Sequence, residues 1–228
     1  MLQSKGNRKK FIFYFFILFF LSSINNLSFF RLSDIKFNVS NIKVAGLSNT
    51  KNFQISKSLD KLNLQNIFFL KKNDISKIIE KNNFVQNFTI KKIYPNTILI
   101  NIKKTKYVGI IINDNKKFLI GSNAKLIPFT KNNDNLPYVF GNVDLYKFLK
   151  FIEIIKKSNF KYIEITEIYY FPSGRWDVKN KKNVLFRFPE KNLLTTLNFA
   201  YKIKENKEFI NHNIIDLRIL KRVVLNNV

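Results

Sequence analysis

A basic segment followed by an uninterrupted apolar run constrains this chain more than any other feature of its sequence. The run FIFYFFILFFL extends from Phe11 to Leu21, and no charged residue follows it until Arg31. Four cations precede it: Lys5, Arg8, Lys9 and Lys10. A helix rises about 1.5 Å per residue and a bilayer core is about 30 Å thick, so residues 11–30 are predicted to form a single transmembrane helix. Because the cations precede the span, residues 1–10 are expected in the cytoplasm and the remainder outside it.

A cleaved signal peptide is the alternative to a retained anchor, because a basic segment followed by an apolar core is also the secretory pattern. The residues after the core lack a small-x-small cleavage site of the Ala-x-Ala kind. Leu27, Phe29 and Phe30 extend the apolar character beyond the position at which a peptidase would cut. The sequence therefore favours an anchor with single-pass, type II topology.

The composition indicates a folded protein and gives weak evidence about its ligands. A length of 228 residues is sufficient for two small domains, and 46% hydrophobic residues with 25 Phe can fill their cores. The formal charge of +25 suggests nucleic-acid binding as one alternative. The basic residues are scattered in pairs such as Lys71 and Lys72, which is typical of a solvated surface, so no nucleic-acid partner is predicted. The absence of Cys excludes disulfides and thiolate metal sites.

Residues 37–106 are predicted to form a small α+β module. Its expected elements are a strand over 37–44, a turn at Gly46, a helix over 51–62, a helix from Asp74 capped by Asn73 or Asp74, and hairpin strands at 88–90 and 98–102. Both helices have one apolar stripe, so they should cover the same face of the sheet.

Residues 107–228 are predicted to form a mainly antiparallel mixed-sheet domain with flanking helices. Its expected elements are strands at 118–120 and 126–127, a helix over 145–155, a meander of strands at 163–165, 176–178 and 184–188, a helix over 190–205, and a last strand at 223–225 on the edge of the sheet. The predicted fold class is therefore α+β, with one transmembrane helix before the two modules.

The first module resembles a POTRA domain, and the chain resembles the FtsQ/DivIB family of bacterial cell-division proteins. In the first module the resemblance rests on Ile42, Val44, Gly46, Phe84, Val85 and the run Tyr94–Ile98. In the second module it rests on three strings in the family's order: Gly174–Asp177, Phe188–Glu190 and Asp216–Arg218. Three sites depart from the family's pattern: Lys104, Tyr107 and the turn Ile120–Asn123, which is expected to be reshaped.

The resemblance implies a scaffold of the division septum. It implies an anchor in the bacterial inner membrane, a periplasmic C-terminal domain, and recruitment of an FtsB-like protein and, through it, an FtsL-like protein. It assigns the terminal strand to the FtsB-like partner, which gives five predicted partner-binding residues: Arg218, Arg222, Val223, Val224 and Leu225. Arg218 could pair with a partner carboxylate or with Asp216 of its own chain. The alternative function is a POTRA-bearing factor for polypeptide translocation or envelope assembly, which would use an edge of the first module.

The sequence predicts no enzyme, metal or cofactor. The single His, His212, lies in a polar stretch, and no Gly-x-Ser-x-Gly string or glycine-rich phosphate loop occurs. Asp177 and Glu190 are the strongest acidic candidates for a functional role. A turn or cap residue for Asp177, and a helix-start residue for Glu190, are the simpler interpretations.

Overall fold

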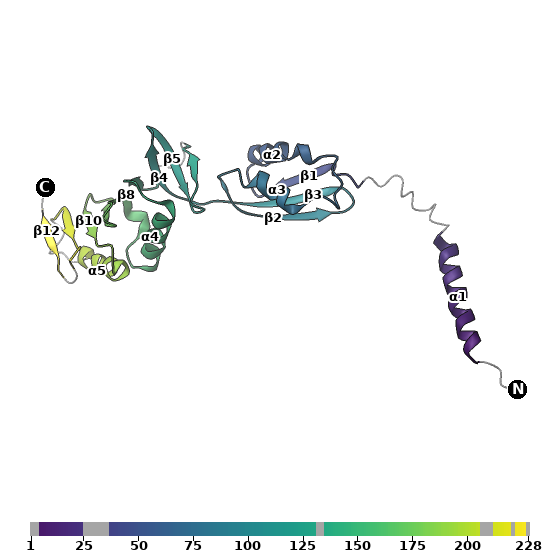
Figure 1. Ribbon diagram of the computed structural model, residues 1–228. Helices are drawn as coiled ribbons and strands as arrows, with labels where there is room; N and C mark the ends of the chain where they lie inside the picture. The colour runs from purple at the N-terminus through teal and green to yellow at the C-terminus, as the bar shows by residue number, and fades with distance from the viewer. Residues whose placement is uncertain (1–4, 25–36, 131–134, 206–211, 220–221, 227–228) are drawn as a thin grey trace.

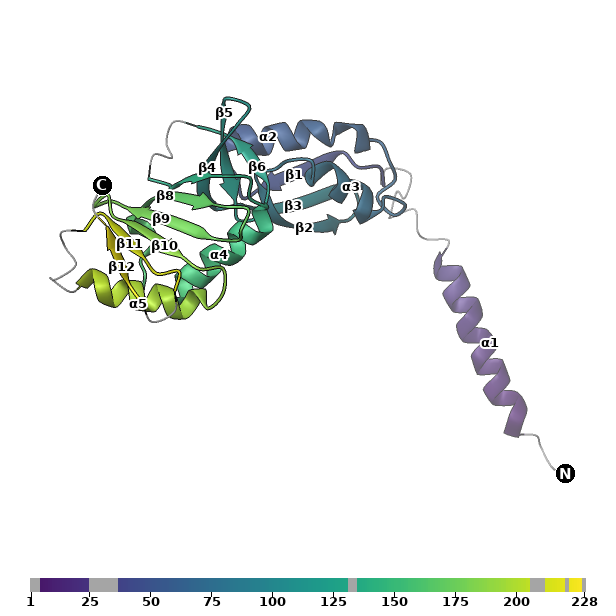
Figure 2. The same cartoon turned by 60° about the vertical axis from the view of Figure 1, so that its left-hand side comes forward.

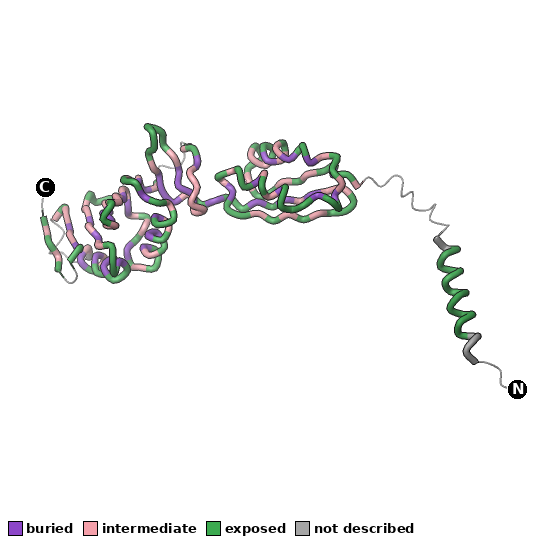
Figure 3. The backbone as a smooth tube through the Cα atoms, in the orientation of Figure 1, coloured by how far each residue is buried: buried purple, intermediate pink, exposed green. Residues whose placement is uncertain are grey.

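The computed structural model describes residues 5–24, 37–130, 135–205, 212–219 and 222–226. Its first helix, α1 (Lys5–Ile24), contains the apolar run, and every side chain from Phe11 to Leu21 is exposed by at least 40% (Figure 3). Over these described ranges, no helix combines the length and the apolar character needed to cross a bilayer. The end of the predicted span, residues 25–30, lies outside the described residues.

The first module has the predicted β-α-α-β-β order (Figure 1). Its elements are β1 (Asn41–Ala45), α2 (Asn49–Ser58), the 3-10 turn η3 (Asp60–Leu62), α3 (Lys72–Ile79), β2 (Val85–Ile93) and β3 (Thr97–Lys104). The sheet order is β1-β3-β2, with β1 parallel to β3 and the predicted hairpin joining β2 to β3. Gly46 has φ +100°, and a Cβ there would lie 1.9 Å from the Ile102 carbonyl oxygen, so only glycine fits this turn.

The apolar stripes of both helices bury into one core against β3, as their spacing predicts. This core includes Ile55 and Leu59 of the α2 region, Ile75 and Ile79 of α3, and Ile98, Ile100 and Ile102 of β3. The predicted cap of α3 is wrong. The N-cap is Lys71, without a side-chain hydrogen bond, because the helix begins before Asn73 and Asp74 and places both in its first turn.

The second module is built on a mixed sheet whose described strands number nine (Figure 2). Its elements are β4 (Tyr107–Asn113), β5 (Lys116–Gly121), β6 (Leu126–Pro128), β7 (Tyr138–Phe140), α4 (Leu145–Lys157), the 3-10 turn η4 (Tyr162–Glu164), β8 (Ile165–Tyr170), β9 (Trp176–Asn180), β10 (Leu185–Phe188), α5 (Leu193–Glu205), β11 (Ile214–Asp216) and β12 (Val224–Asn226). The strand order is β12-β11-β10-β9-β8-β7-β4-β5-β6. The predicted meander is confirmed, since β9 is antiparallel to both β8 and β10.

Helices α4 and α5 cover one face of this sheet. Phe148 and Phe151 of α4, and Leu197 and Ala200 of α5, lie in the same buried core as Ile168, Val178 and Phe186 of the central strands. Trp176 stacks on Phe151 with ring centroids 4.2 Å apart. The same strands therefore present their alternate side chains on the opposite, helix-free face.

Two predicted elements of the second module differ in the structure. The sequence pattern predicts Ile163 in a strand, but it lies in η4 and is exposed, because a 3-10 turn brings the chain from α4 to the start of β8. The pattern also predicts Glu190 at the start of a helix, but α5 begins at Leu193. The carboxyl end of the Glu190 side chain instead lies beside Gly174, whose φ of +79° forms the β8–β9 turn.

The turn between β5 and β6, where the sequence departs from the family's pattern, contacts the first module. Asn123 donates from Nδ2 to the carbonyl oxygens of Asn83 and Val85, both at 2.9 Å. Ser122 Oγ donates to Gln86 Oε1 at 2.7 Å, and buried Thr105 donates to the same oxygen at 2.9 Å. This network places β6 next to the first module, whereas β12 lies at the opposite end of the second module's sheet (Figure 1).

Candidate functional site

The last described strand, β12, forms one edge of the nine-stranded sheet. It pairs antiparallel with β11 through the partners Ile215 with Leu225 and Asp216 with Val224. Within the described part of the chain, no strand covers the other side of β12. Its outer backbone groups are therefore positioned to bond to an added strand.

A cluster of five charged side chains lies across the strands next to this edge. We call it the charge cluster, and its members are Arg175, Asp177, Arg187, Asp216 and Arg218. The sheet register places Asp177 opposite Arg187, and Arg187 opposite Asp216. Val224 of β12 continues the same row, so the cluster and the edge strand share one face of the sheet.

The cluster is held by ion pairs between poorly solvated aspartates and partly exposed arginines. Arg187 Nε lies 3.7 Å from Asp177 Oδ2, and Arg187 Nη1 lies 3.8 Å from Asp216 Oδ2. Arg175 Nε lies 3.0 Å from Asp177 Oδ1, and Arg218 Nη2 lies 2.5 Å from Asp216 Oδ2. Only 5% of the Asp177 side chain and 12% of the Asp216 side chain are exposed, whereas 30% of Arg187 is exposed.

Several buried polar atoms of the cluster lack hydrogen-bond partners among the described residues. They are Arg175 Nε, Arg187 Nε and Asp177 Oδ1. The short Arg175 to Asp177 distance therefore represents a Coulombic contact without hydrogen-bond geometry. Since unpaired buried polar atoms are costly, these atoms lower the net stabilisation that the ion pairs provide.

The two carboxylates have opposite pKa shifts. Burial raises the pKa of Asp177, and the charges of Arg175 and Arg187 offset part of that rise. Burial also acts to raise the pKa of Asp216, but hydrogen bonds from Arg218 outweigh it, so the pKa of Asp216 lies below its usual range. The same hydrogen bond raises the pKa of Arg218. Asp216 and Arg218 therefore form the tighter pair of the cluster.

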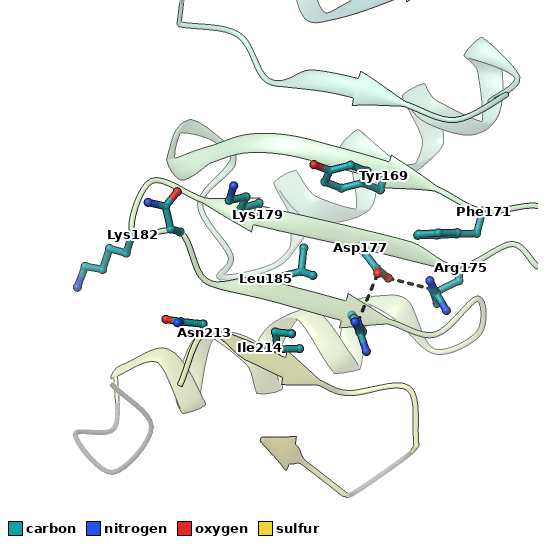
Figure 4. A pocket seen from close by; sticks show the side chains of 11 residues that line it. Tyr169, Phe171, Arg175, Asp177, Lys179, Lys182, Leu185, Asn213 and Ile214 are labelled. Atoms are coloured by element: carbon teal, nitrogen blue, oxygen red, sulfur yellow. Dashed lines mark ion pairs between the residues drawn. The ribbon is translucent and has the colours of Figure 1, made fainter. Parts of the chain in front are cut away.

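An open groove of about 920 Å³ occupies the helix-free face between β8 and β11 (Figure 4). Its lining combines members of the charge cluster with aromatic and amide side chains, including Tyr169, Phe171 and Asn213. The Arg175 guanidinium lies 3.8 Å from the centre of the Phe171 ring. A hydrogen bond to Glu167 and burial raise the pKa of Tyr169 to about 12, with burial the larger cause, so its hydroxyl stays protonated. The groove thus offers cations, hydrogen-bond donors and flat apolar surfaces to a ligand.

The structure places the five predicted partner-binding residues at or beside this edge. Arg218 hydrogen-bonds to Asp216 through Nε at 2.9 Å, which is the intramolecular arrangement that the sequence left open. Val224 is 47% exposed, while Val223 and Leu225 are partly buried against the core. Arg222 is exposed and precedes β12. Whether these residues bind a partner stays a prediction.

The sequence did not predict that the other members of the charge cluster lie together. Asp177 is a buried residue within β9, so the simpler interpretation of it as a turn or cap residue is wrong. A usable signal was present, since Arg175 with Asp177 and Asp216 with Arg218 are oppositely charged pairs with the two-residue spacing of one strand face. In the described ranges, no group of three or more His, Cys, Asp or Glu side chains could hold a metal ion.

Comparison with known proteins gives consistent matches. The family described as "POTRA domain, FtsQ-type" matches residues 37–104. Cell division protein FtsQ of Rickettsia typhi is 25% identical over 190 residues, which cover 80% of this chain and 70% of the relative. The FtsQ of Rickettsia prowazekii is also 25% identical, with 80% and 69% covered. Residues 37–104 therefore form an FtsQ-type POTRA domain, and the chain is similar to FtsQ proteins over 80% of its length.

Other FtsQ/DivIB proteins match shorter parts of the chain. Cell division protein DivIB of Clostridium tetani is 31% identical over 103 residues, which cover 45% of this chain and 39% of that protein. The solved structure of the major extracytoplasmic domain of the trans isomer of DivIB from Geobacillus stearothermophilus is 13% identical, covers 45% of this chain and 92% of that one, and has a TM-score of 0.34. The match to the POTRA family confirms a POTRA domain within the predicted α+β fold, and the similarity to FtsQ and DivIB proteins supports a role in cell division.

Proposed function

We propose that the chain is a non-enzymatic scaffold of the division septum, which binds an FtsB-like protein and, through it, an FtsL-like protein by strand addition to β12. The observation on which this rests is the position of β12 at the edge of the sheet, in register with the charge cluster. An added strand would bond to the outer side of β12, and alternate side chains of that strand would supply the choice of partner.

The anchor is part of the same proposal. The apolar side chains from Phe11 to Leu21 point to all sides of α1 and are all exposed, which suits a helix surrounded by lipid. Four preceding cations favour a cytoplasmic amino terminus. We accordingly propose a single-pass inner-membrane protein with residues 1–10 in the cytoplasm, a span over 11–30, a POTRA domain over 37–106 and a second domain over 107–228 in the periplasm.

The charge cluster supplies a second contact for the partner. Its three arginines exceed its two aspartates by one positive charge, and 30% of the Arg187 side chain is exposed. A strand added to β12 would lie three strand spacings, about 14 Å, from β10. A carboxylate that balances the charge at Arg187 would therefore come from a part of the partner that crosses the helix-free face. Electrostatic matching of this kind favours one partner over others.

The test compares proline substitutions on two edge strands in the full chain held in nanodiscs. Val224→Pro prevents backbone pairing at β12 and should abolish capture of the FtsB-like partner. Thr89→Pro, on the exposed edge strand β2 of the first module, should leave capture unchanged. Circular dichroism and melting must show that each variant is folded. Capture that is unchanged by Val224→Pro in a folded chain would refute the interface.

The alternative function, in polypeptide translocation or envelope assembly, has one specific observation in its favour. The strand β2 is also an edge strand, and it extends over nine residues. Such an edge could bind extended polypeptides by strand addition. The named relatives are cell division proteins, which favours the scaffold. Binding of unfolded polypeptides that Thr89→Pro removes and Val224→Pro spares would support the alternative.

A further inference from the structure

The end of the first module at which the chain enters has an unusual group of exposed apolar side chains. We call this group the end patch, and its members are Leu64, Phe68, Phe69, Ile93 and Tyr94. They are between 48% and 84% exposed. Exposed apolar residues that occur singly are normal, but several gathered on one surface mark an interaction site.

Backbone hydrogen bonds hold together the two loops that contribute the end patch. The Leu64 N–H donates to the carbonyl oxygen of Val39 at 3.1 Å, and the Ile67 N–H donates to that of Phe37 at 2.8 Å. The hairpin turn after β2 is joined to the same place, since the Ser40 N–H donates to the Asn96 carbonyl oxygen at 3.0 Å. Both loops therefore lie where the described chain enters the module, at the end toward which the β2 arrow points (Figure 1).

Aromatic stacking connects the two loops. The ring centres of Phe68 and Tyr94 are 4.9 Å apart, and those of Phe37 and Phe68 are 5.2 Å apart. Lys92 Nζ also donates to the Ile67 carbonyl oxygen at 2.6 Å. These contacts fix the positions of the Phe68 and Tyr94 rings. The end patch therefore lies next to Phe37, the first described residue of the module.

The number of residues between the apolar run and the first module limits how far the end patch can lie from the membrane. Seven residue steps separate Phe30 from Phe37, and an extended chain covers at most about 3.5 Å per residue, so the module's entry lies within about 25 Å of the end of the proposed span. This step rests on the anchor in the proposed function. An end patch so close to the bilayer has the lipid surface as its nearest apolar environment.

The residues around the patch suit an anionic lipid surface. Lys71 and Lys72 follow the first loop, Lys91 precedes the hairpin turn, and all three are exposed. Tyr side chains place their rings at the headgroup level of a bilayer, Phe side chains bury at the boundary between headgroups and acyl chains, and Lys side chains are attracted to anionic lipids. We propose that the end patch docks the POTRA module onto the surface of the membrane that anchors α1.

A site-specific fluorophore in reconstituted vesicles tests this docking. The chain has no Cys, so Phe69→Cys provides a unique site for an NBD label in the full chain. In vesicles of phosphatidylethanolamine and phosphatidylglycerol, this label should be quenched strongly by spin-labelled lipid. A label at Tyr146→Cys, which replaces an aromatic residue that is 68% exposed on α4, should be quenched several-fold less.

Further variants separate lipid from other occupants of the patch. Lys71→Glu with Lys72→Glu should reduce quenching at position 69 several-fold in anionic vesicles and have little effect in phosphatidylcholine alone. A label at Leu64→Cys should lose its quenching when Phe68 and Phe69 are changed to Ser. Protection of position 69 that appears without lipid and grows with protein concentration would indicate a second copy of the chain and overturn the proposal.

Alkaline extraction distinguishes failure of the patch from failure of the anchor. A chain that resists extraction but whose label at position 69 is quenched no more than the label at position 146 retains the anchor and overturns the docking. A chain that alkali removes, yet whose label at position 69 is quenched by lipid, supports the docking and overturns the anchor. Loss of both properties overturns both proposals.

Discussion

Arg187 faces Asp177 across the β9–β10 pair, with its Nε 3.7 Å from the Oδ2 of a carboxylate that is almost entirely buried. Because Arg187 also lies 3.8 Å from Asp216, one guanidinium links three neighbouring strands. The other face of these strands contributes Val178, Phe186 and Ile215 to the helix-covered core, and β11 pairs with the edge strand β12. The energetics of this arrangement can be measured without any partner.

The substitution Arg187→Met should destabilise the second module. It keeps a long apolar stem but leaves Asp177 with Arg175 as its remaining close cation. Breaking a fully buried ion pair costs about 3–5 kcal/mol, and partial exposure of Arg187 reduces the expected loss to about 2 kcal/mol. Urea unfolding followed by the fluorescence of Trp176, the only Trp of the chain, measures it.

The matched control is Lys179→Ala, which removes a more exposed ion pair with Glu167 at 3.6 Å. Surface pairs contribute about 0–1 kcal/mol, so this variant should unfold almost like the wild type. If Arg187→Met costs no more than Lys179→Ala, the charge cluster does not stabilise the sheet.

The substitution Asp216→Asn should change how stability depends on pH. The folded pKa of Asp216 lies below the unfolded value of about 3.9, so ionised Asp216 stabilises the fold above about pH 4. That contribution disappears as the pH falls through the folded pKa. The variant should therefore be less stable than the wild type by about 1 kcal/mol at neutral pH, and the two curves should converge in acid.

Asp177→Asn serves as the comparison because the pKa of Asp177 is shifted in the opposite direction. A raised folded pKa means that the folded state binds the proton more tightly than the unfolded state. Ionisation of Asp177 then lowers the stability of the wild type as the pH rises from the unfolded pKa through the folded pKa. Parallel pH profiles for the two variants would contradict these assignments.

The substitution Asn123→Ala should loosen the junction between the modules without unfolding either. It removes the bonds from Nδ2 to Asn83 and Val85, each of which contributes about 1 kcal/mol. Spin labels at Phe53→Cys and Tyr146→Cys, one in each module, report the distance between the modules by pulsed electron resonance. The variant should broaden that distance distribution.

Ser173→Ala, in the exposed β8–β9 turn, is the control for the junction and should leave the distribution unchanged. An equally narrow distribution in Asn123→Ala would show that the turn does not hold the modules together.

The substitution Phe151→Ala should cost about 3–5 kcal/mol, because it removes a large side chain from the core beneath the sheet. It also exposes the face of Trp176 on which Phe151 stacks, so the emission of the folded state should shift to the red. Tyr146→Ala, at an exposed position of the same helix, should change stability by less than about 0.5 kcal/mol. Similar losses in the two variants would contradict the assignment of Phe151 to the core.

Elements with strong local periodicity were predictable from the sequence. Alternation at Ile98, Ile100 and Ile102 predicted a strand of the hairpin, and the helical spacing of Phe148, Ile152 and Ile155 predicted α4. Local patterns did not predict elements whose structure depends on packing against distant segments. The strand β4, which lies inside the sheet between β5 and β7, was not predicted. Val108 lies in the core beneath the helices and Ile110 in a separate core with Leu119 and Ile127, so both faces of β4 are buried and its sequence is a nearly continuous apolar run without alternation.

The candidate site also has one part that was predictable from the sequence and one part that was not. The terminal edge strand and Arg218 followed from the sequence and its family resemblance, and the structure places both at one end of the sheet. The remainder of the charge cluster did not follow. Asp177, Arg187 and Asp216 meet only because β10 pairs antiparallel with β9 and parallel with β11 in one register. A shift by one residue would turn these side chains to the opposite face.

The sequence by itself determined the apolar segment, the two-module order, the POTRA pattern, the terminal strand and the resemblance to a division family, because each depends on residue types at short spacing along the chain. The tertiary structure decided which carboxylates are buried, how the Asn123 turn joins the modules, and how two separate loops form the end patch. These features depend on pairing between segments that are distant in sequence. Such pairing is fixed by the packing of the whole sheet rather than by any local run of residues.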